Sequence, residues 1–185
     1  MILWINPNYK KNGQSEGQEM KNLIFINGTM GVGKTMTSKT LLKLLPNCVF
    51  LDGDWCWYAD PWTVTQETKI MSKKNMSFLL DSFLNCSVYE NVIFCWVMHV
   101  ENMIYDILSS IKSTGYNFYK FSLICSENAL ISRIQKDIDY GVREDGILER
   151  ALSRMSNYLK MDTVKIDVSD ITPEQAAHTI YDIIY

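Results

Sequence analysis

The stretch Gly28-Thr29-Met30-Gly31-Val32-Gly33-Lys34-Thr35 matches the pattern G-x-x-x-x-G-K-S/T, and we call it the P-loop below. Glycines allow its backbone to turn with positive φ and to approach a phosphate without an intervening Cβ. Successive N–H groups and the positive end of the following helix then face the phosphate oxygens. Lys34 supplies a compact charge for β- and γ-phosphates, and the Thr35 hydroxyl can ligate Mg²⁺. The residues expected to hold ATP are Gly28, Thr29, Met30, Gly31, Val32, Gly33, Lys34, Thr35 and Thr37.

Strand-like and helix-like segments alternate on both sides of the P-loop. Short apolar strands are expected at 23–27, 49–51, 92–98, 121–125 and 164–168. Helices are expected from the P-loop to Leu45, from a capping box of Thr63 and Gln66 to about Leu84, over 103–111, 128–137 and 147–155, and from Thr172 onward. This order predicts an α/β fold, with a five-stranded parallel sheet as the middle layer of an α/β/α sandwich.

Composition excludes several classes of protein. The net charge is −3 with no basic stripe, so nothing indicates a nucleic-acid partner. The longest apolar run, 92–98, is too short to cross a bilayer, and no membrane partner is expected. The cysteines form an odd set of five without a C-x-x-C pair, which argues against zinc and favours free thiols in the cytoplasm. The sequence leaves open a monomer or a homodimer.

The first nineteen residues differ in character from the rest. Residues 6–19 are polar without a hydrophobic period, so we expect 1–19 to be a poorly ordered extension and 20–185 to form a single domain. Met20 directly precedes the first expected strand, and we interpret it as a natural start. Alternatively, the apolar Met1 to Ile5 adds an edge strand or a dimer contact.

Two carboxylates follow the second expected strand, in Leu51-Asp52-Gly53-Asp54. On an extended segment both side chains leave the same face toward the carboxyl end of the strand, which is where α/β sheets bind ligands. The third strand instead runs into Met98-His99, without an acidic residue that could activate water. No Asn-Lys-x-Asp or Thr-Lys-x-Asp is present to recognise guanine. A solvated acidic turn is the alternative interpretation of the carboxylate pair.

With the P-loop, these residues resemble the small P-loop kinases of nucleotides and other metabolites. Leu51-Asp52-Gly53-Asp54 is similar to the same stretch in adenylyl-sulfate kinases, and Asp52-x-Asp54 resembles the paired aspartates of shikimate kinase. The proteins labelled nucleotide kinase or AAA domain are similar over 20–185, and chloramphenicol phosphotransferase and tunicamycin-resistance-like proteins belong to the same group. The resemblance implies strand order 2-3-1-4-5 and a short lid around 133–149 that carries arginines.

The resemblance also implies roles for single residues. Lys34 would act on the phosphates, Asp54 would accept the proton of an attacking hydroxyl, and Asp52 would hold a Mg²⁺-bound water. Arg133 and Arg143 would neutralise charge on the transferring phosphoryl group, with Arg150 and Arg154 as weaker candidates. These cations could instead be solvated partners of nearby carboxylates.

The function implied is an ATP-dependent phosphotransferase with a small-molecule acceptor, for which we favour a nucleoside or nucleotide. The alternatives are an antibiotic phosphotransferase and a non-catalytic ATP-binding sensor. The cluster Trp55, Trp57, Tyr58 and Trp62 could stack on a flat acceptor or could cap the core. His99 is expected to be structural or to line the pocket.

Overall fold

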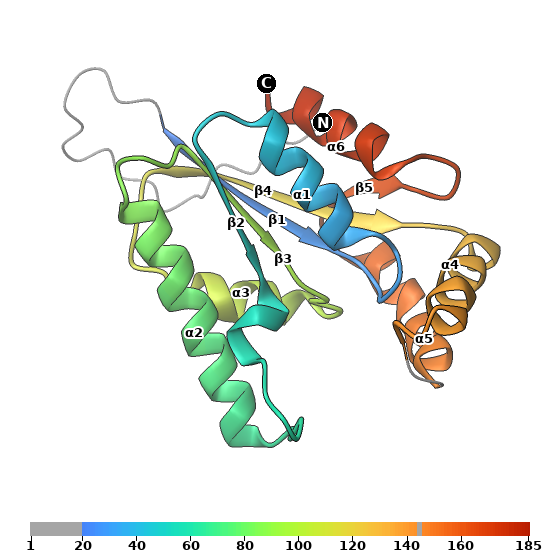
Figure 1. Cartoon of the computed structure of the whole chain (residues 1–185). Helices are drawn as coiled ribbons and strands as arrows, with labels where there is room; N and C mark the ends of the chain where they lie inside the picture. The colour runs from blue at the N-terminus through green and yellow to red at the C-terminus, as the bar shows by residue number, and fades with distance from the viewer. Residues whose placement is uncertain (1–19, 144–145) are drawn as a thin grey trace.

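The computed structural model describes residues 20–143 and 146–185, and within them it has a five-stranded parallel sheet in the order β2-β3-β1-β4-β5 (Figure 1). The strands are β1 Lys21–Asn27, β2 Cys48–Asp52, β3 Asn91–Cys95, β4 Tyr116–Ile124 and β5 Val164–Asp167. The helices are α1 Lys34–Leu44, α2 Gln66–Asn85, α3 Glu101–Leu108, α4 Glu127–Asp139, α5 Ile147–Lys160 and α6 Pro173–Ile184, and a 3₁₀ helix, η1 Gly53–Trp57, follows β2. The predicted fold class and strand order are confirmed.

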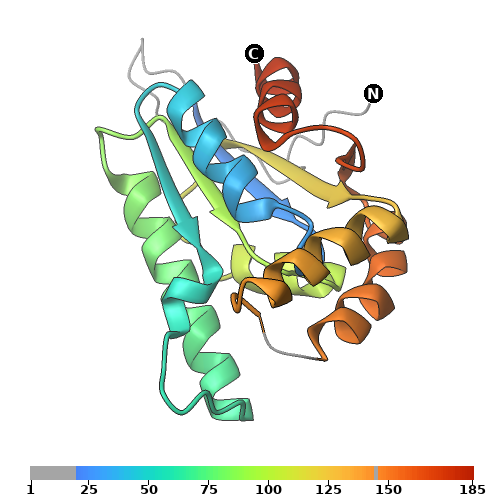
Figure 2. The same ribbon diagram turned by 45° about the vertical axis from the view of Figure 1, so that its right-hand side comes forward.

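Helices cover both faces of the sheet because its central strands are apolar on both sides. One core cluster joins β1 and β3 to α1 and α6, through residues such as Leu41 and Ile180. The other joins the opposite face to α2 and α3, through Leu80 and Ile107. A smaller cluster holds α4 against α5 beyond the carboxyl end of β4. In Figures 1 and 2, α2 lies on one side of the strand ends, and α4 and α5 lie on the other.

Several element boundaries differ from the predicted ones. β3 ends at Cys95 rather than at residue 98, because the chain turns away from the sheet and Met98 adopts a φ of 29°. β4 begins earlier than predicted, at Tyr116, where it pairs with Lys21 of β1. The predicted capping box of Thr63 and Gln66 is wrong. Thr65 has the extended backbone of an N-cap, and its side chain accepts a hydrogen bond from the Thr68 N–H.

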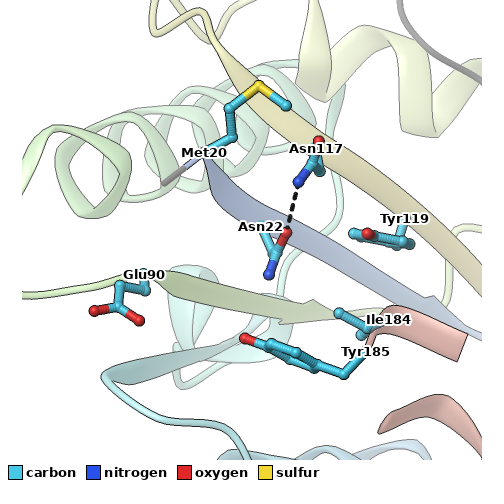
Figure 3. A pocket seen from close by; sticks show the side chains of 7 residues that line it. All are labelled: Met20, Asn22, Glu90, Asn117, Tyr119, Ile184 and Tyr185. Carbon is cyan, nitrogen blue, oxygen red and sulfur yellow. Dashed lines mark hydrogen bonds between the residues drawn. The ribbon is translucent and has the colours of Figure 1, made fainter. Parts of the chain in front are cut away.

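At the amino ends of the strands, three asparagines form a ladder across neighbouring strands. Asn22 Nδ2 donates to Asn91 Oδ1 at 2.8 Å. Asn117 Nδ2 donates to Asn22 Oδ1 at 3.1 Å, and this second bond is drawn in Figure 3. The ladder borders a cavity of about 260 Å³ between the start of β1 and the end of α6. Parallel α/β sheets bind ligands at the opposite, carboxyl end of the strands, so we assign the ladder a structural role in fixing strand register.

No helix in residues 20–143 or 146–185 is both long enough and apolar enough to cross a bilayer. The predicted extension, 1–19, lies outside the described residues, as do positions 144 and 145 of the predicted lid.

Candidate active site

The P-loop connects β1 to α1 at the carboxyl end of the sheet, where the sequence predicts it. Gly31 has a φ of 80°, and a Cβ built on it would lie 2.6 Å from Ile134 Cγ1 of α4. A side chain at this position would therefore be strained by its backbone and would also collide with the core. Glycine is required here by the close packing of the loop on α4.

α5 fixes the other wall of the P-loop. The Thr29 hydroxyl donates a 2.7 Å hydrogen bond to the backbone carbonyl of Ala151. Met30 packs against the cluster formed by α4 and α5, and Arg154 Nη1 lies 3.4 Å from Met30 Sδ. The loop is consequently held in place by residues more than a hundred positions away in the sequence.

Lys34 lies back over the loop, with its Nζ donating to the Thr29 carbonyl oxygen at 2.9 Å. Burial lowers the pKa of Lys34, and the nearby negative groups, among them Asp52 and Asp54, oppose that shift. The acidic pair thus acts electrostatically on the ammonium group, which the P-loop holds by its hydrogen bond to Thr29.

The acidic pair meets the P-loop through Asp52. The Thr35 hydroxyl donates to Asp52 Oδ2 at 2.9 Å, and Cys95 Sγ lies 3.5 Å from the same oxygen. The other oxygen, Oδ1, accepts from the Asp54 backbone N–H at 3.1 Å and so caps η1. Both oxygens of this buried carboxylate have partners, which fixes its orientation.

Asp54 follows on η1, and its carboxylate is oriented by Trp96. The indole Nε1 of Trp96 donates to Asp54 Oδ1 at 3.0 Å. Loss of solvent around the carboxyl group and the neighbouring Asp52 raise the pKa of Asp54, and the Trp96 hydrogen bond, Lys34 and Arg143 oppose that increase. The two carboxylates thus have different surroundings, since one accepts a hydrogen bond from Thr35 and the other from Trp96.

The two arginines predicted for the lid lie in different environments. Arg133 donates to the backbone carbonyls of Val32, Val168 and Ser169, which binds α4 to the P-loop and to the end of β5. Arg143 pairs through Nε with Asp137 Oδ2 at 2.7 Å. The positive charge of Arg143 nevertheless acts to lower the pKa values of both Lys34 and Asp54. Action of either arginine on a phosphoryl group stays a prediction.

A cavity of about 160 Å³ adjoins the P-loop on the side of α6. Thr37 is buried on α1 and lines this cavity, as does Arg133, and apolar walls come from Val168 and Ile171. The sequence pattern predicted Thr37 as an ATP contact but gave no indication of these walls, because they come from the segment between β5 and α6.

Two residues near the site were missed or underrated by the sequence analysis. Trp96 was assigned to the third strand, whereas its indole binds Asp54. Arg154 was a weak lid candidate, yet it reaches the P-loop at Met30, and none of the ion pairs in the described part of the chain includes it. The signal for Arg154 was its helical spacing from Ala151 and Tyr158, which face the core.

His99 lies just past β3, where sequence reasoning placed it beside the pocket. Its Nδ1 is buried and has no hydrogen-bond partner within the described residues. Burial lowers the pKa of His99, and the charge of Arg154 lowers it further. Both causes favour the neutral form of the imidazole.

The described residues contain no cluster of three or more His, Cys, Asp or Glu side chains that could hold a metal ion by themselves. Mg²⁺ bound together with a nucleotide needs no such cluster, since Mg²⁺ keeps several waters and takes one or two protein ligands plus phosphate oxygens. The Thr35 hydroxyl and the Asp52 carboxylate, whose Oγ1 and Oδ2 atoms are 2.9 Å apart, are the protein groups available to such an ion.

Comparison with known proteins assigns this chain to a family. The model of the family described as "AAA domain" matches residues 24–170. A search of the curated proteins finds no match. Among solved structures, a tunicamycin resistance protein from Deinococcus radiodurans is similar with a TM-score of 0.67 and 20% identity, over 89% of this chain and 95% of that one.

Two further solved structures share the architecture. The APS kinase of Mycobacterium tuberculosis has a TM-score of 0.63 and 12% identity, over 90% of this chain and 99% of that one. Shikimate kinase from Acinetobacter baumannii has a TM-score of 0.60 and 16% identity, over 89% of this chain and 93% of its own. At these identities the likeness demonstrates the fold. The chain belongs to the AAA domain family, and its fold is that of the small P-loop kinases.

Proposed function

We propose that this protein is an ATP-dependent phosphotransferase that moves the γ-phosphoryl group to a hydroxyl of a small molecule. The observation that carries the proposal is the position of Asp54. Its carboxylate is oriented by a hydrogen bond from Trp96. Asp54 also stands only two residues after Asp52, which binds Thr35 of the P-loop. A carboxylate held beside a nucleotide site, but outside it, is suited to receive an acceptor.

The P-loop would bind the phosphates of ATP, and the cavity next to it would bind the base. Backbone N–H groups at the start of α1, together with Lys34, face the phosphates. The base would enter the cavity of about 160 Å³ between Thr37 and Ile171, with the Arg133 side chain at its edge. Arg133 would then position the base, in addition to the role in charge neutralisation that the family resemblance implies.

Mg²⁺ would lie at the Thr35 hydroxyl, with Asp52 holding one of its waters. When bound, the ion would neutralise negative charge on the phosphates of ATP. The protein's part is to fix the Thr35 hydroxyl and the Asp52 carboxylate relative to each other, which the 2.9 Å hydrogen bond between them does. Asp54 is left to the acceptor, whose proton it would take.

Catalysis of this kind depends on positioning and on charge. Lys34 from the P-loop, and Arg143 and Arg154 from the α4–α5 side, would surround the transferring group with positive charge. Arg143 would have to leave Asp137, to which it is now paired at 2.7 Å.

The rival function is an ATP-binding sensor that transfers nothing. A panel of nucleosides, nucleotides, sugars and antibiotics, incubated with the protein, Mg²⁺ and γ-labelled ATP, separates the two. Phosphotransfer predicts label in at least one acceptor, and the signal should vanish in Asp54→Asn. ATP binding without label in any acceptor would favour the sensor. Label confined to antibiotics would identify the antibiotic phosphotransferase alternative.

A further inference from the structure

An exposed group of aromatic rings, which we call the aromatic strip, follows Asp54 and consists of Trp55, Trp57, Tyr58 and Trp62. Trp57 and Trp62 stack on each other with ring centroids 4.3 Å apart and planes 23° apart. Trp55, Tyr58 and Trp62 remain 57%, 97% and 55% exposed. Clustered exposed rings are uncommon on a soluble protein and mark binding surfaces. Trp55 also packs edge-on against the buried Phe50, with ring centroids 5.3 Å apart, so one ring of the strip does cover the core. Stacking of the strip on a flat acceptor stays a prediction.

The geometry of η1 places this strip beside the site. Side chains three residues apart eclipse one another on a 3₁₀ helix. Asp54 and Trp57 are three residues apart on η1, so they project from the same side of it. Trp62 then extends that side by stacking on Trp57. A ring with a hydroxyl at Asp54 would thus lie along the Trp57–Trp62 pair.

η1 is held firmly in this position. Asn75 of α2 donates to the Cys56 carbonyl at 3.1 Å. On the other side, Gly53 packs so closely on Trp96 that an added Cβ would lie 2.5 Å from the indole. The strip and Asp54 therefore keep a fixed spacing, which is what selection by shape requires.

The charges of the segment that carries the strip disfavour one kind of acceptor. From residue 44 to residue 68 the chain has no Lys or Arg, whereas it carries Asp52, Asp54, Asp60 and Glu67. The cations of the site come instead from the P-loop and from the α4–α5 side, where Arg154 lies against Met30. An acceptor with its own phosphate, sulfate or carboxylate would meet only like charge along this segment.

We propose that the acceptor is an uncharged ring compound with a free hydroxyl, bound with its ring against the Trp57–Trp62 pair. This inference rests on the proposed phosphotransferase function and narrows its substrate class. The hydroxyl oxygen forms the new bond to the γ-phosphorus, the bond from that phosphorus to the β–γ bridging oxygen breaks, and ADP leaves. Asp54 takes the hydroxyl proton. Nucleosides and neutral glycosides are uncharged rings with a free hydroxyl, whereas nucleotides and sugar acids carry an anionic group.

The test uses matched pairs that differ only in charge: a nucleoside with its 5′-monophosphate, and a neutral sugar with its sugar acid. The full chain is assayed with Mg²⁺ and γ-labelled ATP. The neutral member of at least one pair should have a kcat/KM at least about 10-fold above that of its anionic partner. The nucleoside and sugar arms identify which source supplies the ring. Preference for the anionic members would overturn the inference but would leave the phosphotransferase function standing.

Variants test the strip itself. Trp57→Ala should raise the acceptor KM by about 10-fold while the KM for ATP stays unchanged, because stacking on an aromatic ring is lost. Trp62→Ala, in the exposed loop after η1, should give the same shift even if Trp57→Ala does not fold. Phe78→Ala, which removes a 71% exposed ring from α2, is the control and should change neither KM. An unchanged acceptor KM in a folded Trp62→Ala protein would contradict the role of the strip. Absence of any labelled acceptor in the wild type would instead refute the proposed function.

Discussion

The Thr35 hydroxyl donates a 2.9 Å hydrogen bond to the Asp52 carboxylate and so joins the first turn of α1 to the end of β2. The P-loop motif and the acidic pair, seventeen residues apart, thereby become parts of one site. Asp52 is buried, and it also accepts hydrogen bonds from Cys95 and from the Asp54 backbone N–H. These contacts fix the orientation of the carboxylate beside Thr35.

Asp52→Ala should raise the Mg²⁺ concentration needed for half-maximal activity by about 10- to 100-fold, because groups that orient a metal's ligands typically contribute that much. The measurement is a Mg²⁺ titration of phosphotransfer at fixed ATP. Asp60→Ala removes an exposed carboxylate from the loop after η1 and should leave the titration unchanged. Equal curves for wild type and Asp52→Ala would contradict this role.

Asp54→Asn should lower kcat by about 10²- to 10⁴-fold, because it removes the proton acceptor but retains an oxygen for the Trp96 indole. ATP affinity, measured by calorimetry, should stay within about twofold, since the change leaves the P-loop intact. A variant that loses ATP affinity and kcat together would place Asp54 in the nucleotide site instead.

The variants Arg143→Ala and Arg133→Ala should distinguish an arginine that acts in catalysis from one that stabilises the fold. The Arg143–Asp137 pair is partly exposed, so its loss should cost less than about 1 kcal/mol of folding stability. If Arg143 acts on the phosphoryl group, its removal should cut kcat by about 10²-fold or more. Arg133→Ala leaves backbone carbonyls of Val32, Val168 and Ser169 without their partner, and should cost about 2 to 3 kcal/mol.

Chemical denaturation and steady-state kinetics on both arginine variants give the comparison. Stability should be lost mainly in Arg133→Ala, whereas Arg143→Ala should lose turnover with little loss of stability. A stable Arg133→Ala protein would show that those carbonyl contacts are dispensable.

Gly31→Ala should destabilise the P-loop. Its positive φ costs an L-residue about 1 to 3 kcal/mol, and the new methyl group would meet Ile134 at 2.6 Å. We expect weaker ATP binding together with a lower melting temperature. Gly141→Ala has a similar φ of 68° but open space around its Cβ, so it should show the backbone cost without the loss of ATP affinity.

The sequence was sufficient for the parts of this site that depend on local chemistry. The P-loop, the strand before it and the helix after it follow from one continuous stretch, and the buried strands follow from apolar runs. The strand order came from family resemblance, because nothing in a single strand specifies its neighbours. The capping box failed at Thr63 because several threonines compete there, and backbone conformation selects Thr65.

The contacts that could not be predicted are those between distant residues. Thr29 binds Ala151 because α5 packs beside the P-loop in the folded chain. Trp96 binds Asp54 because the segment after β3 lies beside η1. The carbonyl contacts of Arg133 are of the same kind, since helical spacing placed that side chain near the P-loop but could not say what it would touch.

The most direct test of the central claim is Lys34→Ala, compared with wild type for transfer of label from γ-labelled ATP to the acceptor. Among the described residues, the Lys34 side chain hydrogen-bonds the Thr29 carbonyl alone, so the variant should fold normally. Lys39→Ala, on the exposed side of the same helix, is the matched control. We predict that Lys34→Ala lowers the transfer rate by at least about 10²-fold and that Lys39→Ala does not. A folded Lys34→Ala protein that labels the acceptor at the wild-type rate would contradict the account.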